Sequence, residues 1–150
     1  MLKFGQHVIQ QSCVFWESKL SFAFVNIKPV LPGHVLVSPK RIVPSFTNLS
    51  PEENVDLFKG AQQLASLLKT HYKTESLTLV VQDGVDAGQS VHHVHIHLMP
   101  RQAGDFANND DIYGEIERVD STTSEIRSEM EMESEAMIYK ELVKEMGITS

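Results

Sequence analysis

Alternation of apolar and polar residues predicts four β-strands along the chain. Each predicted strand is short, rich in β-branched or aromatic residues, and bounded by glycine, proline or polar residues. The four segments are residues 20–26, 34–38, 76–82 and 90–99. The Pro32-Gly33 pair marks a turn between the first two, and the short loop DGVDAG before the fourth allows antiparallel neighbours.

One long helix between the second and third strands is the clearest of the predicted elements. Ser50 is a favourable N-cap, Pro51 suits the first helical position, and Glu53 completes a capping box. The helix is expected over residues 51–71, with one buried face formed by Val55, Phe58, Ala61, Leu64, Ala65 and Leu68. These elements predict an α+β fold, a mostly antiparallel sheet with one long helix packed on it.

The last third of the chain differs in character. Residues 104–125 are polar and acidic without clean periodicity, which predicts a loop after Pro100 closes the fourth strand. From about residue 125 an acidic helix ending at Gly147 is predicted on Met130, Met137, Leu142, Val143 and Met146. The expected organisation is a domain over 1–113, an acidic flexible loop over 114–124, and a C-terminal helical extension of the same domain over 125–150.

Composition and charge narrow the function classes. Of the 150 residues, 105–150 hold 13 acidic and 4 basic side chains, whereas 1–104 hold 7 acidic and 9 basic ones. No basic stripe appears, so nucleic acid is not an expected partner, and no apolar run is long enough to predict a membrane span. The single cysteine, Cys13, excludes an intramolecular disulfide and a cysteine zinc cluster. A reducing intracellular compartment is the expected location.

The segment SVHHVHIHLMP, residues 90–100, holds four of the seven histidines. Because alternate side chains of a strand point to opposite faces, His93, His95 and His97 are expected on one face. The opposite, apolar face would consist of Val94, Ile96 and Leu98. Three imidazoles are costly to bury without partners, so the histidine face is expected to line a cleft. His92 is out of phase with the other three and is expected at the surface or the strand edge.

Three interpretations of this histidine face are open from the residues alone. The histidines could be structural, although three on alternate positions are unusual for that role. They could bind a metal ion, with Asp83 or Asp86 of the preceding loop as a further ligand. Alternatively, one histidine could act as a nucleophile, since imidazole can attack phosphorus when its other nitrogen is held as a hydrogen-bond donor.

The loop before the histidines favours the third interpretation. DGVDAGQSV, residues 83–91, supplies two glycines, Gln89 and Ser90 close to the histidine face. Glycines let backbone N–H groups approach an anion closely, and serine and glutamine add neutral donors. A phosphate-binding loop is therefore expected, although a plain connection between strands has the same pattern.

The histidine segment resembles the histidine triad (HIT) family, whose pattern is His-φ-His-φ-His-φ-φ with φ an apolar residue. AGQSV at 87–91 and PGHVLV at 32–37 are placed as in that family. Further segments resemble its Fhit branch, the dinucleoside polyphosphate hydrolases: FGQH at 4–7, FVNIKPV at 24–30, VQDGVDAGQSV at 81–91 and PRQAGDF at 100–106. The Hint branch typically ends in a tryptophan-containing tail, whereas the only tryptophan here is Trp16.

The resemblance implies a role for each of four histidines. His95 would attack the α-phosphorus of a dinucleoside polyphosphate such as diadenosine triphosphate (Ap3A), forming a covalent nucleotidyl-histidine and releasing ADP. Water would then release AMP. The backbone carbonyl of His93 would accept from Nδ1 of His95, His97 would help the leaving group depart, and His34 would support the cluster.

The resemblance also implies a set of substrate-binding residues. These are His7, Asn26, Gln82, Gly88, Gln89, Ser90, Val91 and His97, with Phe4 framing the nucleotide pocket. An ordinary surface histidine is the alternative for His7. Tyr113 matches a loop tyrosine of the branch but is equally well a simple exposed residue. His71 and Cys13 are expected to be structural.

Cofactor, partner and location follow from the same resemblance. The family implies a homodimer, Mg²⁺ or Mn²⁺ acting on the substrate polyphosphate without a tightly bound protein metal site, and residence in the cytoplasm, with the nucleus as a further compartment. Two alternative functions stay open. One is a Hint-like hydrolase of nucleoside phosphoramidates or adenylylated small molecules, and the other is a signalling module in which the bound nucleotide is the signal.

Overall fold

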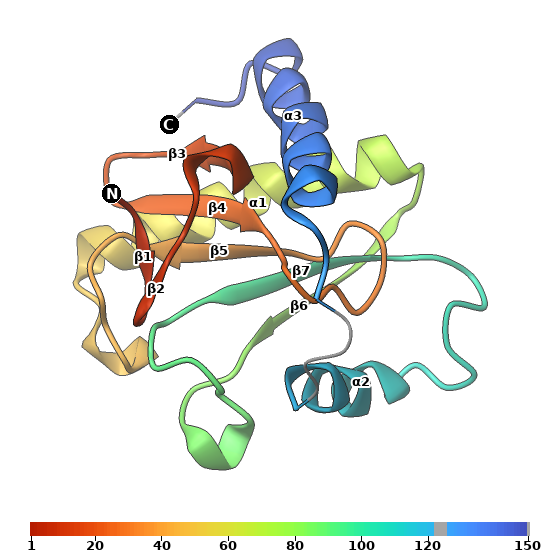
Figure 1. Ribbon diagram of the computed structural model, residues 1–150, viewed down its shortest axis with the longest axis horizontal. Helices are drawn as coiled ribbons and strands as arrows, with labels where there is room; N and C mark the ends of the chain where they lie inside the picture. The colour runs from red at the N-terminus through yellow and green to blue at the C-terminus, as the bar shows by residue number, and fades with distance from the viewer. Residues whose placement is uncertain (122–125, 150) are drawn as a thin grey trace.

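The computed structural model describes residues 1–121 and 126–149 of the chain (Figure 1). The strands are β1 Lys3–Phe4, β2 His7–Val8, β3 Val14–Glu17, β4 Ser21–Val25, β5 Val35–Pro39, β6 Ser76–Val81 and β7 Ile96–Arg101. The α-helices are α1 Pro51–Tyr72, α2 Asp111–Asp120 and α3 Glu129–Glu145. Three single 3-10 turns complete the elements: η1 Gln11–Cys13, η2 Phe46–Asn48 and η3 Val85–Ala87.

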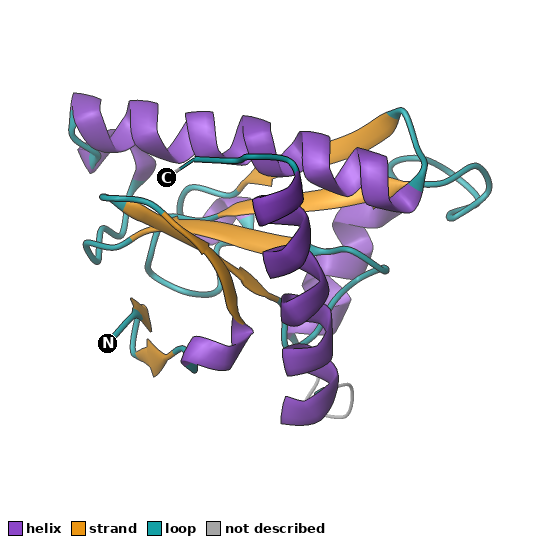
Figure 2. Ribbon diagram, turned by 90° about the horizontal axis from the view of Figure 1, so that it is seen from above, coloured by secondary structure: helices purple, strands orange, loops and turns teal. Residues whose placement is uncertain are grey.

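The centre of the molecule is a five-stranded antiparallel sheet of order β3-β4-β5-β7-β6. Helices α1 and α3 share one hydrophobic cluster with the same face of the sheet, including Leu64, Tyr139 and Ile96. The hairpin of β1 and β2 lies on the opposite side from α1, as Figure 2 shows. There Phe4 packs on Phe24 and its neighbours, while α2 packs farther along the sheet. The α+β fold is therefore confirmed. The β1–β2 hairpin and α2 cover separate parts of the second face of the sheet.

The long helix α1 begins as the sequence predicts. The Ser50 side chain accepts from the backbone N–H of Glu53 over 3.1 Å, and the Glu53 carboxylate accepts from the N–H of Ser50 over 2.9 Å. The predicted buried face was partly wrong, because Val55 is 65% exposed. The buried stripe consists of Leu57, Ala61, Leu64, Leu67 and Leu68. Val55 precedes Leu57 by two residues, or about 200° around a helix, so it faces solvent.

The histidine segment is a shorter strand than predicted. Strand β7 begins at Ile96, and Pro100 lies inside it, paired with Leu77 of β6. The prediction that Pro100 closes the strand was wrong. The ladder of β5 with β7 ends at Leu98, so Pro100 has a partner strand on one side only, where a residue without an N–H is tolerated. Ahead of the strand, the Val94 N–H donates to the carbonyl of Val43 over 2.8 Å.

Helix α2 was not predicted at all, because residues 104–125 were interpreted as loop. Ile112, Ile116 and Val119 are buried at helical spacing, and the first two pack against Met99. The acidic residues around these three apolar positions obscured their helical spacing in the sequence. Three apolar residues are enough to hold a short helix when they can pack on the sheet. The predicted division after residue 113 does not follow a break in secondary structure, and the part of the predicted loop at 122–125 lies outside the described residues.

The C-terminal helix is confirmed, and of the apolar residues on which it was predicted Leu142 and Val143 pack against the main core. Met130 and Met137 are exposed, whereas Met132, Ala136 and Tyr139 face the core. Strands β1, β2 and β3 are further elements that the sequence analysis missed. Within the described part of the chain, none of the helices is both long enough and apolar enough to cross a membrane.

Candidate active site

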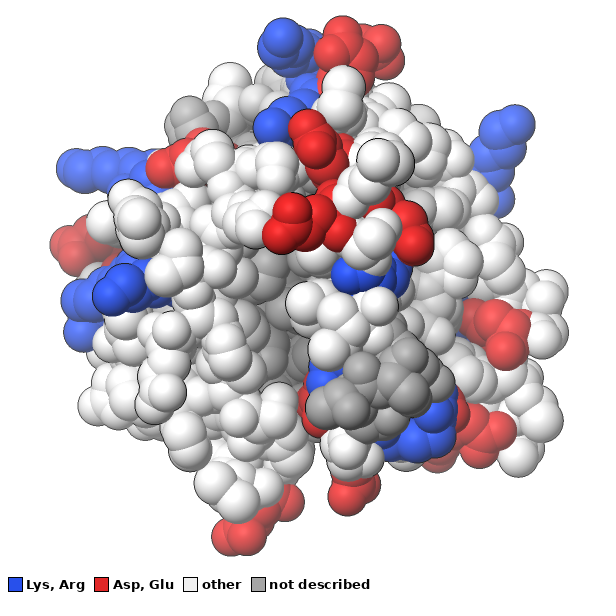
Figure 3. Space-filling model, in the orientation of Figure 1, with Lys and Arg blue, Asp and Glu red and all other residues white. Residues whose placement is uncertain are grey.

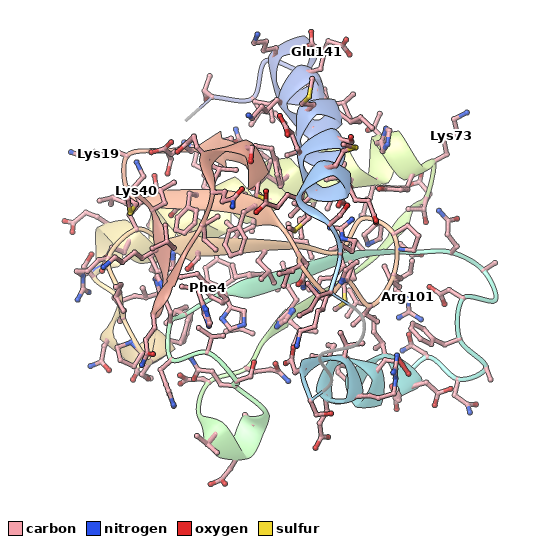
Figure 4. The ribbon with its side chains drawn as sticks, in the orientation of Figure 1. Phe4, Lys19, Lys40, Lys73, Arg101 and Glu141 are labelled. Carbon is pink, nitrogen blue, oxygen red and sulfur yellow. The ribbon has the colours of Figure 1, made fainter. Side chains whose placement is uncertain are left out.

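Four buried histidines gather on the sheet face opposite α1, between the β1–β2 hairpin and α2. Figure 4 shows Phe4 pointing toward this place from the N-terminal hairpin, and in Figure 3 the same face of the molecule is hollowed near its middle. His93 is 0%, His95 5%, His97 4% and His34 1% exposed. Phe4 covers His95 edge-on, with ring centroids 4.8 Å apart. The expectation of an imidazole cluster is confirmed. The rings are almost fully buried, whereas side chains that line an open cleft would be partly exposed.

Burial keeps these imidazoles neutral. It lowers the pKa of His34 to about 3 and, as the largest cause in each case, also lowers the pKa values of His93, His95 and His97. For His97 the neighbouring His95 and His34 add to the effect. A charged imidazolium is disfavoured in such surroundings, so each ring carries one proton near neutral pH.

Hydrogen bonds decide which nitrogen of His93 and His95 carries that proton. The backbone N–H of Gly5 donates to Nδ1 of His93 over 2.9 Å, so the proton of His93 is on Nε2, which donates to the carbonyl of Pro39 over 2.8 Å. Nδ1 of His95 lies 2.7 Å from the carbonyl oxygen of His93. Because a carbonyl oxygen only accepts, Nδ1 of His95 is protonated. Its Nε2 therefore keeps a lone pair.

A second chain of hydrogen bonds sets the state of His97. The Val30 N–H donates to Nδ1 of His34 over 2.9 Å, which places the proton of His34 on Nε2. That nitrogen lies 2.9 Å from Nδ1 of His97, which must accept, so the proton of His97 is on Nε2. This Nε2–H is buried and has no hydrogen-bond partner among the residues that the structure describes. A buried donor of this kind indicates a place for a ligand acceptor.

The two chains leave a lone pair on His95 and a donor on His97, whose ring centroids are 4.9 Å apart. A nucleophile beside a hydrogen-bond donor is the arrangement that substitution at phosphorus needs. The same bonds leave one imidazole lone pair, that of His95, for a metal ion, whereas a zinc site takes three or four ligands. Among residues 1–121 and 126–149, no three His, Cys, Asp or Glu side chains are arranged around a common metal position.

The predicted phosphate loop is held by one of its own residues. Gln89 Nε2 donates to the carbonyls of Pro44 and Val91, over 2.9 and 3.0 Å, and its Oε1 accepts from the Gly84 N–H over 2.7 Å. The expectation that the Gln89 amide serves as a free donor for an anion was therefore wrong. The amide instead fixes the loop. Ser90 remains at the surface.

Gly88 and Gln82 lie side by side at this loop. Gly88 has a φ of +93°, and a Cβ there would come within 2.6 Å of Nε2 of Gln82. Glycine is required both by the left-handed backbone and by the close approach. The two predicted substrate-binding residues thus belong to one surface, although they come from the loop and from the end of β6.

Asn26 lies next to the histidine cluster. Its Nδ2 is 3.3 Å from Nε2 of His34, and its Oδ1 accepts from the Lys28 N–H over 2.9 Å. His7 is exposed on β2, directly opposite Phe4 in the hairpin, and its side chain is outside the buried cluster. Val91 packs beside Gly5.

The remaining single residues fit simple structural expectations. His92 is exposed, as its phase in the strand predicts. His71 lies in the last turn of α1 against the ring of Tyr72. Cys13 is buried, and burial raises the pKa of its thiol. Tyr113 is half exposed on α2.

Two residues near the site were missed because they follow the predicted domain end. The Ser90 hydroxyl donates to Oδ2 of Asp120, at the end of α2, over 3.1 Å. Arg127, just before α3, donates from its guanidinium to the backbone carbonyl of Asn26. Neither residue carries a local motif, so only the fold could have revealed them.

Comparison with protein-family models matches the HIT domain to residues 8–104. The chain belongs to the histidine triad (HIT) family. It is 50% identical over 142 residues to bis(5'-adenosyl)-triphosphatase of Dictyostelium discoideum, covering 95% of this chain and 93% of that protein. It is 45% identical over 132 residues to bifunctional bis(5'-adenosyl)-triphosphatase/adenylylsulfatase FHIT of Arabidopsis thaliana, covering 88% and 72%.

Solved HIT structures share the fold. The crystal structure of the C. elegans NitFhit protein matches with a TM-score of 0.80 at 44% identity, over 94% of this chain and 30% of that one. Plasmodium falciparum diadenosine triphosphate hydrolase, solved with cyclomarin A, matches with a TM-score of 0.80 at 31% identity, over 96% and 84%. These findings confirm the resemblance to the Fhit branch.

Proposed function

We propose that this HIT protein hydrolyses dinucleoside polyphosphates, cleaving Ap3A into AMP and ADP. The observation that carries the proposal is the pair of tautomers. Among the described residues, Nε2 of His95 keeps its lone pair and the buried Nε2–H of His97 has no hydrogen-bond partner. The relatives named as bis(5'-adenosyl)-triphosphatases support the choice of substrate.

The first chemical step forms a bond between Nε2 of His95 and the α-phosphorus. The bond from that phosphorus to the bridging oxygen breaks, and ADP leaves with the electron pair. The Nε2–H of His97 donates a hydrogen bond to the departing oxygen, since a diphosphate leaving group needs stabilisation of charge more than a full proton. The phosphorylated ring of His95 is cationic, and the His93 carbonyl accepts from its Nδ1–H.

Water completes the reaction. It attacks the same phosphorus, the nitrogen–phosphorus bond breaks, and AMP leaves as His95 returns to the neutral state and a proton passes to solvent. Splitting one displacement into two through a labile nucleotidyl-histidine is the advantage of an imidazole nucleophile. In this proposal the backbone N–H groups of Ser90 and Val91 stabilise the charge that develops on the phosphate, since those of Gly88 and Gln89 already donate to the carbonyls of Val85 and Gly84.

Product analysis tests the proposal. The protein is incubated with Ap3A, and separately with an AMP phosphoramidate, which is the substrate type of the Hint-like alternative. We expect equimolar AMP and ADP from Ap3A, at a catalytic efficiency well above that for the phosphoramidate. The reverse order of efficiencies would replace this proposal with the Hint-like one, and binding of Ap3A without products would favour the signalling alternative.

The cation belongs to the substrate in this proposal. Mg²⁺ or Mn²⁺ bound to the polyphosphate offsets its charge, and the protein supplies imidazoles and backbone donors. EDTA should lower the rate with Ap3A, and excess Mg²⁺ should restore it. A cation that stays with the protein through gel filtration would contradict this assignment.

The proposed assembly is a homodimer that pairs β6 with β6 of a second copy. In support, β6 is at the sheet edge, pairs with β7 alone among the described strands, and exposes Leu79. An unpaired edge of this kind readily takes up another strand. Light scattering should give twice the mass of 16.9 kDa, and Thr78→Pro in β6 should shift it to the monomer.

The proposed location is the cytoplasm, with a nuclear pool, which subcellular fractionation tests.

A further inference from the structure

The residue just before α3 is tied to the end of β4, far away in the sequence. The backbone N–H of Arg127 donates to the carbonyl of Ile27 over 3.1 Å. Its guanidinium Nη2 donates to the carbonyl of Asn26, the neighbouring residue. In Figure 1 the chain entering α3 passes beside the connection from β4 to β5. One residue from the C-terminal segment thus holds two successive carbonyls of this connection.

The guanidinium is itself held from α3 and α1. Its Nη2 forms an ion pair with Oε1 of Glu135 at 2.7 Å. The Tyr139 hydroxyl donates to Oε2 of Glu135 over 2.6 Å, and the hydroxyl of Tyr72 lies 2.7 Å from that of Tyr139. Because Tyr139 is fully buried in the main core, the chain of contacts is anchored at a rigid point.

Burying this ion pair costs desolvation free energy, so the pair is a poor way to stabilise the fold. The side chains of Arg127 and Glu135 are 20% and 14% exposed. Nε of Arg127 is buried and has no hydrogen-bond partner in the described parts of the chain. Desolvating two charges and leaving one donor unused offsets much of the attraction between them. An arrangement of this kind is better explained by the position that it gives to Asn26.

Asn26 connects the arginine to the reacting histidines. While Arg127 holds its backbone, the Asn26 amide Nδ2 packs 3.3 Å from Nε2 of His34. Both nitrogens carry protons, so this is a packing contact, and the Nε2–H of His34 donates to His97 instead. The Oδ1 atom accepts from the Lys28 N–H, so the amide has a fixed orientation. Arg127 also adds its positive charge to the causes that lower the pKa of His34, after burial and His95.

We propose that Arg127 is a positioning residue that fixes the Asn26–Lys28 connection as a wall of the nucleotide site. The acidic C-terminal helix thereby sets substrate affinity without touching the substrate. The inference rests on the proposed function, with Asn26 binding the nucleotide as the resemblance to the Fhit branch implies. It assigns a role to a part of the chain that follows the matched family region at 8–104.

The test separates affinity from stability with matched variants. Arg127→Met removes the donors and the charge, Arg127→Lys keeps the charge, and Glu135→Gln releases the guanidinium. Met132→Ala is the control, because Met132 lies on the same helix and faces the core. KM and kcat with Ap3A, the dissociation constant of AMP by calorimetry, and thermal unfolding are measured for each, with all kinetics well below the unfolding midpoint.

For Arg127→Met we expect KM and the AMP dissociation constant to rise about tenfold, whereas kcat should change less than about threefold. A change of this size is typical of the loss of one charged hydrogen bond, here one that positions a wall of the binding site. Arg127→Lys and Glu135→Gln should lie between this variant and the wild type. Met132→Ala should lower the midpoint and leave both constants unchanged. Unchanged constants in Arg127→Met, or an equal rise in Met132→Ala, would overturn the proposal. If the wild type fails to cleave Ap3A, the proposed function falls, and the AMP constants alone decide the role of Arg127.

Discussion

The two faces of strand β7 are buried to the same degree by different means. Ile96 and Leu98 are fully buried in the main core, where apolar contact alone holds them. On the other face His97, together with His95 just before the strand, is nearly as buried, yet each of these rings is oriented by a hydrogen bond to another residue of the cluster. Apolar packing is not directional, whereas each histidine hydrogen bond sets a proton position. One face of the strand therefore determines stability and the other determines chemistry.

The largest expected effect is on the chemical face. His95→Asn removes the nucleophile, so we expect turnover of Ap3A to fall by about 10⁴-fold or more. The circular dichroism spectrum should stay that of the wild type, because neighbours of His95 keep their packing. Steady-state assays of both proteins measure this. Retention of a tenth of the activity would mean that another group attacks phosphorus.

The matched change on the apolar face is Leu98→Ala. It should lower the free energy of unfolding by about 2 to 5 kcal/mol through lost burial and a cavity. Turnover per folded molecule should remain close to that of the wild type, because the Leu98 side chain packs in the core, on the opposite face from the imidazoles. Urea titration and active-site counting test the two statements. A loss of turnover as large as that of His95→Asn would remove the distinction between the faces.

His34→Phe sharpens the comparison, since it replaces the imidazole with an aromatic ring that has no nitrogen atoms. Nδ1 of His97 loses its donor, so the proton of His97 is no longer confined to Nε2. We expect kcat to fall by about ten- to a hundredfold, as for loss of one oriented donor to the leaving group. KM should change less. An unchanged kcat would show that the tautomer of His97 is set by something else.

The buried histidines also make stability depend on pH in a predictable direction. Their pKa values are lowered in the folded protein, for His34 to about 3 from an ordinary value of 6.5, so the unfolded chain binds more protons below pH 6.5. The free energy of unfolding should then fall as the pH is lowered, by up to about 1.4 kcal/mol per pH unit and histidine. Between about pH 6.5 and 5.5 carboxylates contribute little. Urea unfolding across this window measures the slope, and His34→Phe should make it shallower. A flat profile would contradict neutral, buried imidazoles.

The smallest expected effect is at the surface. Asp120→Asn removes one carboxylate charge from beside Ser90 while its oxygen can still accept from the hydroxyl. We expect KM for Ap3A to fall by about twofold at low salt and the difference to vanish at high salt, because exposed charges are screened. The comparison of KM at two ionic strengths measures this. A higher KM would indicate that Asp120 helps substrate binding, for example through its cation.

The chemical pattern was readable from the sequence because it is local. Alternation places His93, His95 and His97 on one face, and Ser50 with Glu53 marks the start of α1. The proton positions were not readable without a family resemblance, since the Gly5 N–H that fixes His93 comes from 88 residues away. They depend on which backbone groups the fold brings to each ring.

The errors have the same origin. Pro100 fits inside β7 because β5 begins only at Val35, opposite Leu98, and so does not pair with Pro100, which no local pattern reveals. The apolar stripe of Ile112, Ile116 and Val119 is too short and too diluted by acidic residues to predict a helix by itself. It forms α2 because Met99 and its neighbours on the sheet provide the surface on which it packs.

The measurement that tests the central claim most directly is intact mass spectrometry after brief mixing with Ap3A. The wild type is compared with His97→Asp, in which the intermediate should accumulate, and with His95→Asn. We predict an added adenylyl group in the first two proteins, mapped by peptide analysis to His95, and none in the third. An adduct on another residue, or release of AMP and ADP by His95→Asn at the wild-type rate, would contradict this prediction.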